Sequence, residues 1–382
     1  MGYSLGFWLD HNKEKGEIKV PKNCVELHIN YWSIESKEKF HYLDIGVKLT
    51  LNNDNLESIN FFFPFDLEIK DYMNNLGETI CSRDELLELI FNEKLRSTTE
   101  GPNYKDVIFE GDQKDSLRIY KELDIVNGED TVELISNNDG TTRIVFSKKL
   151  IKSFDDGLSN KHHYFRFRLR LNPENVKKLS QNYDPQDRLV LSRFEKTEII
   201  DFRLNELRDL PGSVCNILNN DYTLKQIHFF LIRDIHDELK LAHADYKRCR
   251  LLEKEVWKEY LIFSKKDLLL PSQMLIYHFC EGKKKEGVYL HIERFNAFAK
   301  FARVKVTIRS LVVFIFSVVL LGAIGSIVAT IFIENRPPNI YSFLRTPISH
   351  HVILVIFIMC LVGFVVYLFN KNYTVQSPIK EK

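Results

Sequence analysis

Apolar residues gather toward the C-terminal end of the chain in two long unbroken runs. The first, Ser310 to Ile333, contains 24 residues without a charge, which as a helix extend about 36 Å and exceed a hydrocarbon core of about 30 Å. The second, Val352 to Phe369, contains 18 uncharged residues. Prolines in the connecting segment interrupt helix formation. The pattern predicts a linker and hairpin over residues 301–370, with transmembrane helices at about 310–333 and 349–369.

The charges that flank these runs predict their orientation. Lysine and arginine crowd the sequence before the first run and after the second, whereas few charges lie between them. By the positive-inside rule both termini face the cytoplasm, and residues 371–382 form a cytoplasmic tail. The pattern therefore predicts a protein of the inner, or cell, membrane with two spans in contact with lipid. Neither run contains a charged residue, so we expect the hairpin to pack or to form a pore rather than to relay charge.

Small residues mark one face of the first run. Gly322, Gly325, Ser326 and Ala329 allow another helix to approach closely. Two interpretations stay open, namely packing of the two helices within one chain and self-association of several chains into a homo-oligomer.

The first half of the chain shows the alternation that is typical of strands. Short segments rich in aromatic and β-branched residues are separated by Asn, Asp and Gly turn signals. These segments are 17–20, 24–32, 42–51, 58–63, 131–135, 142–147 and 164–171. Many strands with few helices predict a β-rich α+β cytoplasmic region that is β-sandwich-like. A capping-box sequence from Ser82 to Glu85 predicts one inserted helix, residues 83–96, in a first domain of residues 1–155.

The following residues, 156–300, are predicted to form a second α+β region. Residues 197–204 and 213–218 have strand character. Between Leu224 and Phe263 there is neither Gly nor Pro, and an apolar spacing of three and four predicts a long helix at about 224–263. Such a helix packs its apolar stripe on the sheet or joins protomers, and the sequence leaves both interpretations open.

Three phenylalanines precede the first apolar run. Phe295, Phe298 and Phe301 alternate with basic residues. They predict an amphipathic stretch that couples the cytoplasmic part to the membrane helices.

Composition and charge narrow the classes of function. The net charge is +1, yet residues 52–139 hold 21 acidic and 8 basic residues, a balance of −13. The six cysteines are scattered without zinc spacing, so neither a disulfide framework nor a metal site is predicted. Nucleotide-binding, hydrolase and metalloprotease motifs are absent from the sequence. We therefore expect no enzyme, no catalytic residues and no cofactor.

One strand combines arginines with aromatic residues. In an extended chain Arg166, Arg168 and Arg170 share one face at intervals of about 6.6 Å, with Lys161 shortly before them. That spacing approximates the phosphates of an extended oligonucleotide, and the arginine fork suits phosphate oxygens. The alternative is that these arginines pair with acidic residues on neighbouring strands.

This layout, a β-rich cytoplasmic region followed by a two-helix membrane hairpin, resembles the membrane effectors of bacterial anti-phage defence systems. The resemblance lies in the layout, without a diagnostic motif. It implies a ligand-gated effector whose sensor domain controls an oligomeric transmembrane pore or ion channel in antiviral defence. The implied ligand is a nucleotide or oligonucleotide made by a partner synthase. The alternative is a membrane-tethered enzyme or adaptor whose hairpin is only an anchor.

Overall fold

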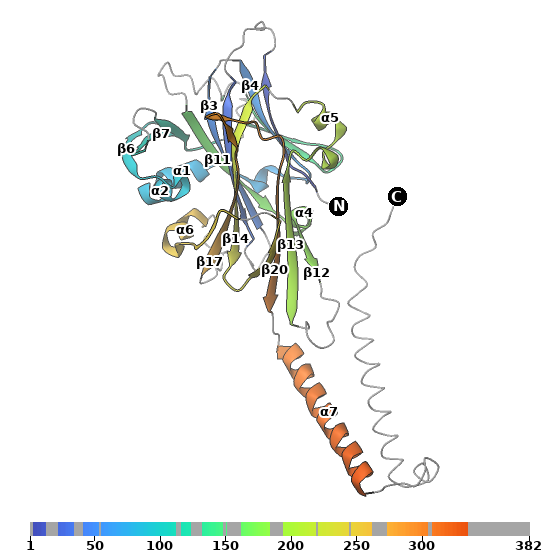
Figure 1. Ribbon diagram of the computed structural model, residues 1–382. Helices are drawn as coiled ribbons and strands as arrows, with labels where there is room; N and C mark the ends of the chain where they lie inside the picture. The colour runs from blue at the N-terminus through green and yellow to red at the C-terminus, as the bar shows by residue number, and fades with distance from the viewer. Residues whose placement is uncertain are drawn as a thin grey trace. The chain divides into compact units, whose positions relative to one another are not determined.

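The computed structural model describes most of the first 304 residues and part of the C-terminal segment. The described residues are 3–12, 22–33, 41–52, 55–111, 116–123, 132–147, 150, 162–183, 194–218, 221–243, 246–261, 273–304 and 308–334. The chain divides into two units, residues 1–304 and 305–382, and each is described by itself. Strands predominate and helices are few, which confirms the predicted β-rich class (Figure 1).

A ten-stranded sheet organises the first unit. Its strands run in the spatial order β16 (Arg248–Leu251), β17 (Met274–Glu281), β14 (Thr223–Asp234), β2 (Cys24–Trp32), β3 (His41–Thr50), β11 (His162–Leu171), β8 (Leu117–Tyr120), β7 (Tyr104–Phe109) and β6 (Leu95–Glu100), while β5 (Tyr72–Met73) also pairs with β11. Most neighbours are antiparallel, but β14 pairs with β2 and β11 pairs with β8 in parallel. The predicted strands 24–32, 42–51 and 164–171 are thus confirmed as three adjacent strands of this sheet.

Two four-stranded sheets and one small hairpin complete the β structure. One sheet contains β1 (Gly6–His11), β4 (Leu56–Phe63), β10 (Thr142–Phe146) and β9 (Val132–Ser136). The other contains β12 (Ser180–Tyr183), β13 (Glu195–Leu204), β20 (Phe295–Val304) and β15 (Glu238–Ala242), and the hairpin contains β18 (Lys284–Lys285) and β19 (Val288–Tyr289). The predicted strands at 58–63, 131–135, 142–147 and 197–204 correspond to β4, β9, β10 and β13, whereas 17–20 lies outside the described residues.

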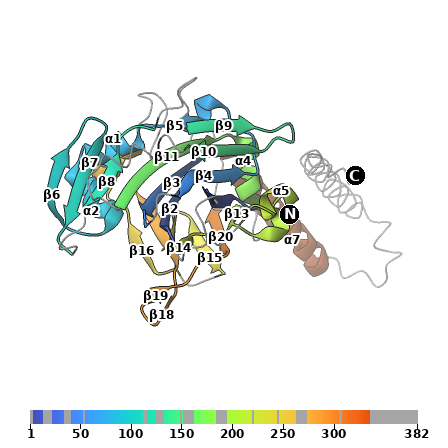
Figure 2. The same ribbon diagram turned by 90° about the horizontal axis from the view of Figure 1, so that it is seen from above.

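The central strands of the large sheet bury side chains on both faces. Successive side chains of a strand point to opposite faces, so the odd-numbered Leu27, Ile45 and Phe229 enter a core shared with both smaller sheets. Figure 2 shows the large sheet extending from β6 and β7 at one end to β14 and β16, with the smaller sheets beside it.

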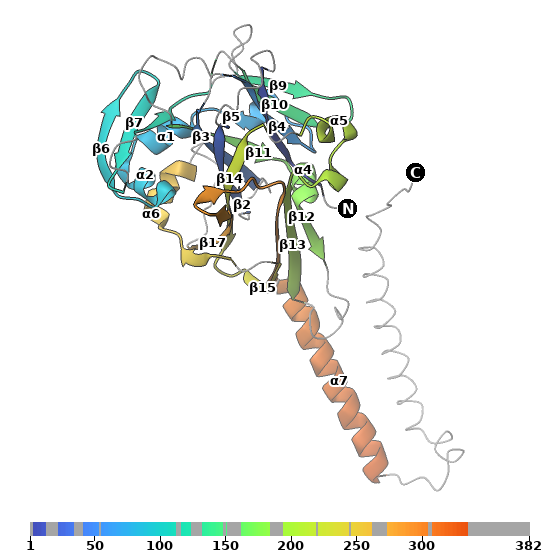
Figure 3. The same ribbon diagram turned by 45° about the horizontal axis from the view of Figure 1, so that its top comes forward.

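Three short helices cover the other face. They are α1 (Leu76–Cys81), α2 (Asp84–Phe91) and α6 (Lys254–Leu261), which lie together in Figure 3. Trp257 and Tyr260 of α6 join a second core with Trp32 and Ile232 of the sheet. The even-numbered residues of the central strands are therefore interior as well. The remaining helical segments of this unit are η1 (Ile69–Asp71), α4 (Pro173–Leu179), η2 (Leu207–Asp209) and α5 (Gly212–Cys215).

The predicted long helix at 224–263 is wrong. These residues form β14, β15, β16 and α6 instead. The apolar residues spaced by three and four begin at Ile235, after β14, and belong in turn to β15, β16 and α6 rather than to one helix, so the spacing is a coincidence.

Three further predictions need correction. The inserted helix ends at Phe91 rather than 96, because Asn92 adopts a left-handed conformation with φ of 54° and the next strand begins at Leu95. The predicted strand at 213–218 contains the short helix α5. The predicted division near residue 155 is also not seen, because β14 and β17 share one sheet with β2 and β3.

The described part of the second unit is the helix α7 (Ile308–Glu334). The second apolar run, the connecting loop and the tail at 371–382 lie outside the described residues. Within the part of the chain that the structure describes, no helix has both the length and the apolar character needed to cross a membrane.

A close approach at Gly46 yields a test of this architecture. A Cβ atom at Gly46 would lie 2.2 Å from the Tyr164 hydroxyl, so Gly46→Ala is expected to lower the free energy of unfolding by about 1–3 kcal/mol. The cost should shrink when Tyr164 is also replaced by Ala, as urea unfolding of the four proteins of this double-mutant cycle would show.

Gly212→Ala is the matched control, since a Cβ there meets nothing within 4 Å. An equal loss of stability for both single variants would contradict the packing of Tyr164 across Gly46.

Candidate functional site

The predicted arginine strand is an inner strand of the large sheet. Arg166, Arg168 and Arg170 do share one face of β11, but Arg166 and Arg168 are 1% and 0% exposed. The predicted contact with phosphates needs these side chains at the surface, whereas Arg166 and Arg168 are interior because the helices of the second core cover this face. Arg170 is 29% exposed at its side chain and pairs with Asp71. Lys161 lies outside the described residues.

The alternative interpretation, pairing with acids of neighbouring strands, describes Arg168. It donates from Nε and Nη2 to the two carboxylate oxygens of Asp44, which lies opposite it on β3. The Trp32 indole and the Tyr260 hydroxyl also donate to Asp44 Oδ2, each at 2.7 Å. A fully buried carboxylate is thus held by groups from β11, β2 and α6.

Arg166 contributes a second positive charge to this interior. Its Nη1 donates to the Tyr164 hydroxyl at 3.1 Å, and its Nη2 lies 4.0 Å from Asp44 Oδ2. Within the described residues Nε and Nη2 have no hydrogen-bond partner. Arg166 therefore has N–H groups that could donate further hydrogen bonds, next to the Arg168–Asp44 ion pair.

The register extends this face across the sheet as one transverse row. Arg166 lies opposite Gly46, Gly46 opposite His28, His28 opposite His228, and His228 opposite Cys280. Side chains of directly opposed residues point to the same face of a sheet, so all five belong to the face that α1, α2 and α6 cover. Hydrogen-bonded backbones on five adjacent strands fix these positions.

Histidines and a cysteine cluster at the β17 end of the row. The facing nitrogens His228 Nδ1 and His278 Nε2 are 3.0 Å apart. Ligand atoms of His228, His278 and Cys280 all lie within 4.8 Å of one another, as do those of Glu26, His28 and His228. His28 and His278 are buried, whereas His228 and Cys280 are half-buried.

Burial and neighbouring charges set the protonation of this cluster. Burial lowers the pKa of His28 to about 4 and that of His278 to about 3. Burial alone would raise the pKa of the Cys280 thiol, but the hydrogen bond and charge of His228 lower it below its usual value. Burial opposes ionisation of Glu26 too, yet the imidazoles of His228 and His28, each with Nε2 at 3.8 Å from Glu26 Oε1, bring its pKa below the ordinary range. Neutral His28 and His278 thus stand beside acidic groups that ionise readily. Burial acts to lower the pKa of His228, but Cys280 and Glu26 raise it above its ordinary value.

The arrangement offers nitrogen and sulfur donors to a cation, which makes this cluster the candidate functional site. Sequence reasoning missed it because the ligands come from strands distant in the chain. One signal was present, since His28, His228 and His278 are each flanked in the sequence by apolar or aromatic residues on both sides. Only the strand order places them together.

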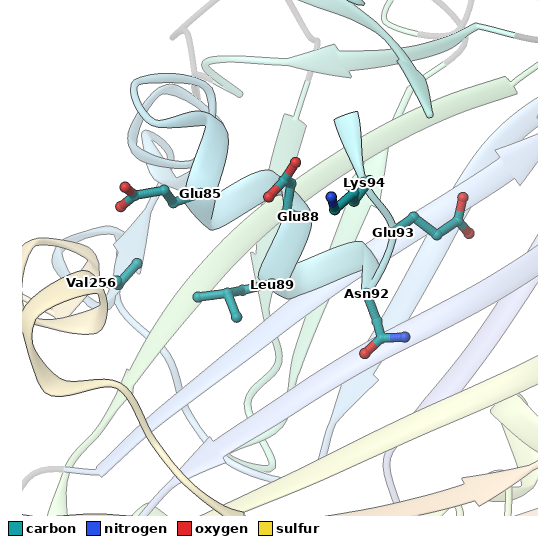
Figure 4. A pocket seen from close by; sticks show the side chains of 7 residues that line it. All are labelled: Glu85, Glu88, Leu89, Asn92, Glu93, Lys94 and Val256. Atoms are coloured by element: carbon teal, nitrogen blue, oxygen red, sulfur yellow. The ribbon is translucent and has the colours of Figure 1, made fainter. Parts of the chain in front are cut away.

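A shallow hollow over α2 and α6 is a weaker candidate. Figure 4 shows Leu89 of α2 and Val256 of α6 among its walls, with Glu85, Glu88 and Glu93 around them. Glu85 pairs with Arg83, and Glu88 accepts a hydrogen bond from the backbone of Leu95. These carboxylates serve the local structure.

The predicted coupling phenylalanines belong to β20. Phe295 and Phe301 are buried in the core shared with the large sheet, whereas Phe298 lies half-buried on the opposite face of the strand. The three rings do not form one face, because a strand with a repeat of two places odd and even positions apart.

Comparisons with known proteins add little to this geometry. No protein-family model and no curated protein matches the chain. Among solved structures, the chain is similar to the Fcho1 mu homology domain of Danio rerio with a bound Eps15 peptide. The match covers 80% of this chain and 81% of that chain, at 7% identity and a TM-score of 0.14. A score this low supports no conclusion about fold or function.

The arginines of β11 provide a test of the buried charge arrangement. Arg168→Gln leaves the Asp44 carboxylate buried without its charge partner, and we expect a loss of about 3–5 kcal/mol in the free energy of unfolding. Arg170→Gln breaks a partly exposed pair and should cost about 1 kcal/mol or less. Urea unfolding measures both, and equal losses would contradict the interior position of Arg168.

Proposed function

We propose that this protein is a membrane effector in which the β-rich unit senses a signal and the C-terminal segment, assembled from several copies, opens a pore. The observation that carries the proposal is the position of β20. This strand pairs with both β13 and β15, ends at Val304, and is followed in the chain by α7 from Ile308. A signal in the β-rich unit therefore has a short covalent route to the apolar segment.

A chain of alternating charges fixes the end of β20. Arg303 donates to Asp237, whose other carboxylate oxygen lies 2.8 Å from Arg233 Nη2. Arg233 Nη1 in turn lies 2.7 Å from Glu198 of β13. The side chains of Asp237 and Arg233 are 1% and 6% exposed, so water screens their interaction weakly. Displacement of β14, which carries Arg233, would disturb the end of β20.

Apolar exposure on α7 supports an apolar environment for the second unit. Its exposed large apolar residues are Leu311, Val312, Phe314, Ile315, Phe316, Val318, Val319, Leu321 and Ile327. Contiguous apolar surface of this kind marks interaction with a membrane or another protein. The uncharged run of 24 residues in the sequence favours the membrane.

The small residues of α7 support assembly from several copies. Added Cβ atoms at Gly322 and Gly325 would meet nothing within 4 Å, so another helix has room to approach there together with Ser326 and Ala329. A hairpin contributes only two helices, and a pore therefore needs a homo-oligomer.

The proposal also includes the class of ligand and the biological context. A nucleotide or oligonucleotide made by a partner synthase remains the ligand class that the layout suggests, with bacterial anti-phage defence as its context. An adaptor or enzyme that uses the hairpin only as an anchor is the alternative, and measurement of current separates the two.

The test is current across a planar bilayer that contains the purified full-length chain. With linear and cyclic oligonucleotides added on the side of the β-rich unit, we expect stepwise currents that a responsive ligand increases. Arg303→Gln should reduce the ligand dependence at least several-fold, because it removes the β20 end of the charge chain. Arg294→Gln is the control, since that side chain is 73% exposed. If the protein inserts into the bilayer but no current appears with any oligonucleotide, the result would contradict the pore and favour a hairpin that is only an anchor.

A further inference from the structure

Two imidazoles and a thiol meet where β14 pairs with β17. His228 lies opposite Cys280, and Phe230 opposite His278, in an antiparallel ladder without a bulge. Nitrogens bound to zinc at 2.0–2.1 Å in tetrahedral geometry are roughly 3.4 Å apart. The facing nitrogens of His228 and His278, 3.0 Å apart, are already near that separation. The Cys280 sulfur belongs to the same group of atoms within 4.8 Å.

The imidazoles of this group contact each other directly. His278 is 4% exposed, and its Nε2 shares a hydrogen bond with His228 Nδ1, which a cation bound between the two nitrogens would replace.

Glu26 on β2 lies behind His228. Its Oε1 is 3.8 Å from His228 Nε2, on the side of the ring away from His278, and its Oε2 is 3.1 Å from the Lys225 ammonium. A carboxylate beside the outer nitrogen of a metal-binding histidine orients the ring and raises its basicity. Glu26 is therefore placed as a positioning residue for His228.

We propose that His228, His278 and Cys280 bind one divalent transition-metal ion, for which Zn²⁺ fits this nitrogen and sulfur donor set best. Three protein ligands leave a fourth position for water or an added ligand. The proposal is independent of the membrane function, because it concerns only side chains of the large sheet.

A second set shares His228 but lacks sulfur. Glu26, His28 and His228 also lie within 4.8 Å of one another. The ion pair with Lys225 occupies the Glu26 carboxylate, and sulfur attracts zinc more strongly than a carboxylate oxygen that is already paired. The first set is therefore the proposed ligand set.

The experiment uses the purified full-length chain, stripped with a chelator and titrated with Co²⁺ and then Zn²⁺. We expect one equivalent of Co²⁺ to give the d–d bands of a tetrahedral site and a thiolate-to-cobalt absorption, which Zn²⁺ abolishes. Cys280→Ser should remove the thiolate absorption. His278→Gln should weaken Co²⁺ binding at least as much as Glu26→Gln does. Glu26→Gln should weaken it by about 10–100-fold.

Cys249→Ser is the matched control, because Cys249 is the exposed cysteine on the adjacent strand β16, and it should leave the titration unchanged. Circular dichroism checks the fold of each variant. A second measurement needs no variant, since bound Zn²⁺ should slow alkylation of Cys280 and not of Cys249.

Three outcomes would overturn the proposal. The first is the absence of a cobalt spectrum in the folded protein, and the second is alkylation of Cys280 at the same rate with and without Zn²⁺. The third is a spectrum that survives Cys280→Ser but disappears with His28→Gln, which would assign the ion to the other set. Currents in a bilayer bear on none of these results, so failure of the metal site and failure of the membrane function are distinguishable.

Discussion

The interior of the β-rich unit depends on compensation of the negative charge of the buried Asp44 carboxylate by neighbouring groups. An ionised carboxylate inside a protein costs several kcal/mol unless charge and hydrogen bonds compensate it. Asp44 is fully buried, and Arg168, Trp32 and Tyr260 supply that compensation. Since Tyr260 belongs to α6, the same contacts that satisfy Asp44 hold α6 against the large sheet. The face of β11 that carries Arg166 and Arg168 is therefore covered by α6 and lies in the interior, although its polar residues are typical of a solvent-exposed face.

Burial of this face of the large sheet shifts the pKa values of its other polar residues. His28, His228 and Cys280 follow Arg166 along the same transverse row. Burial keeps His28 neutral, while its neighbours favour charge on Glu26. Strand β14 also carries Arg233, which is joined through Asp237 to Arg303 at the end of β20. One strand therefore connects the histidine cluster with the end of the β-rich unit.

Local pattern predicted much of the strand content, because alternation at Cys24–Trp32 and Thr142–Phe146 is a property of neighbouring residues. It could not distinguish Glu238–Ala242, Arg248–Leu251 and Lys254–Leu261 from one long helix, because apolar residues spaced by three and four happen to continue from one element into the next. Burial of Arg168 depends on α6, which lies about ninety residues later in the chain. The metal-binding geometry depends on strand order, and no local pattern contains that order. Lys161 and the second apolar run lie outside the described residues, so these predictions stay predictions.

A membrane effector requires that the C-terminal segment enters a lipid bilayer. Extraction of membranes with alkaline carbonate, after expression of the full-length chain, tests this insertion, because carbonate releases peripheral proteins and leaves inserted ones. We expect the chain to remain in the sedimented membranes together with a known integral protein. Complete release into the supernatant, with the integral protein retained in the pellet, would contradict it.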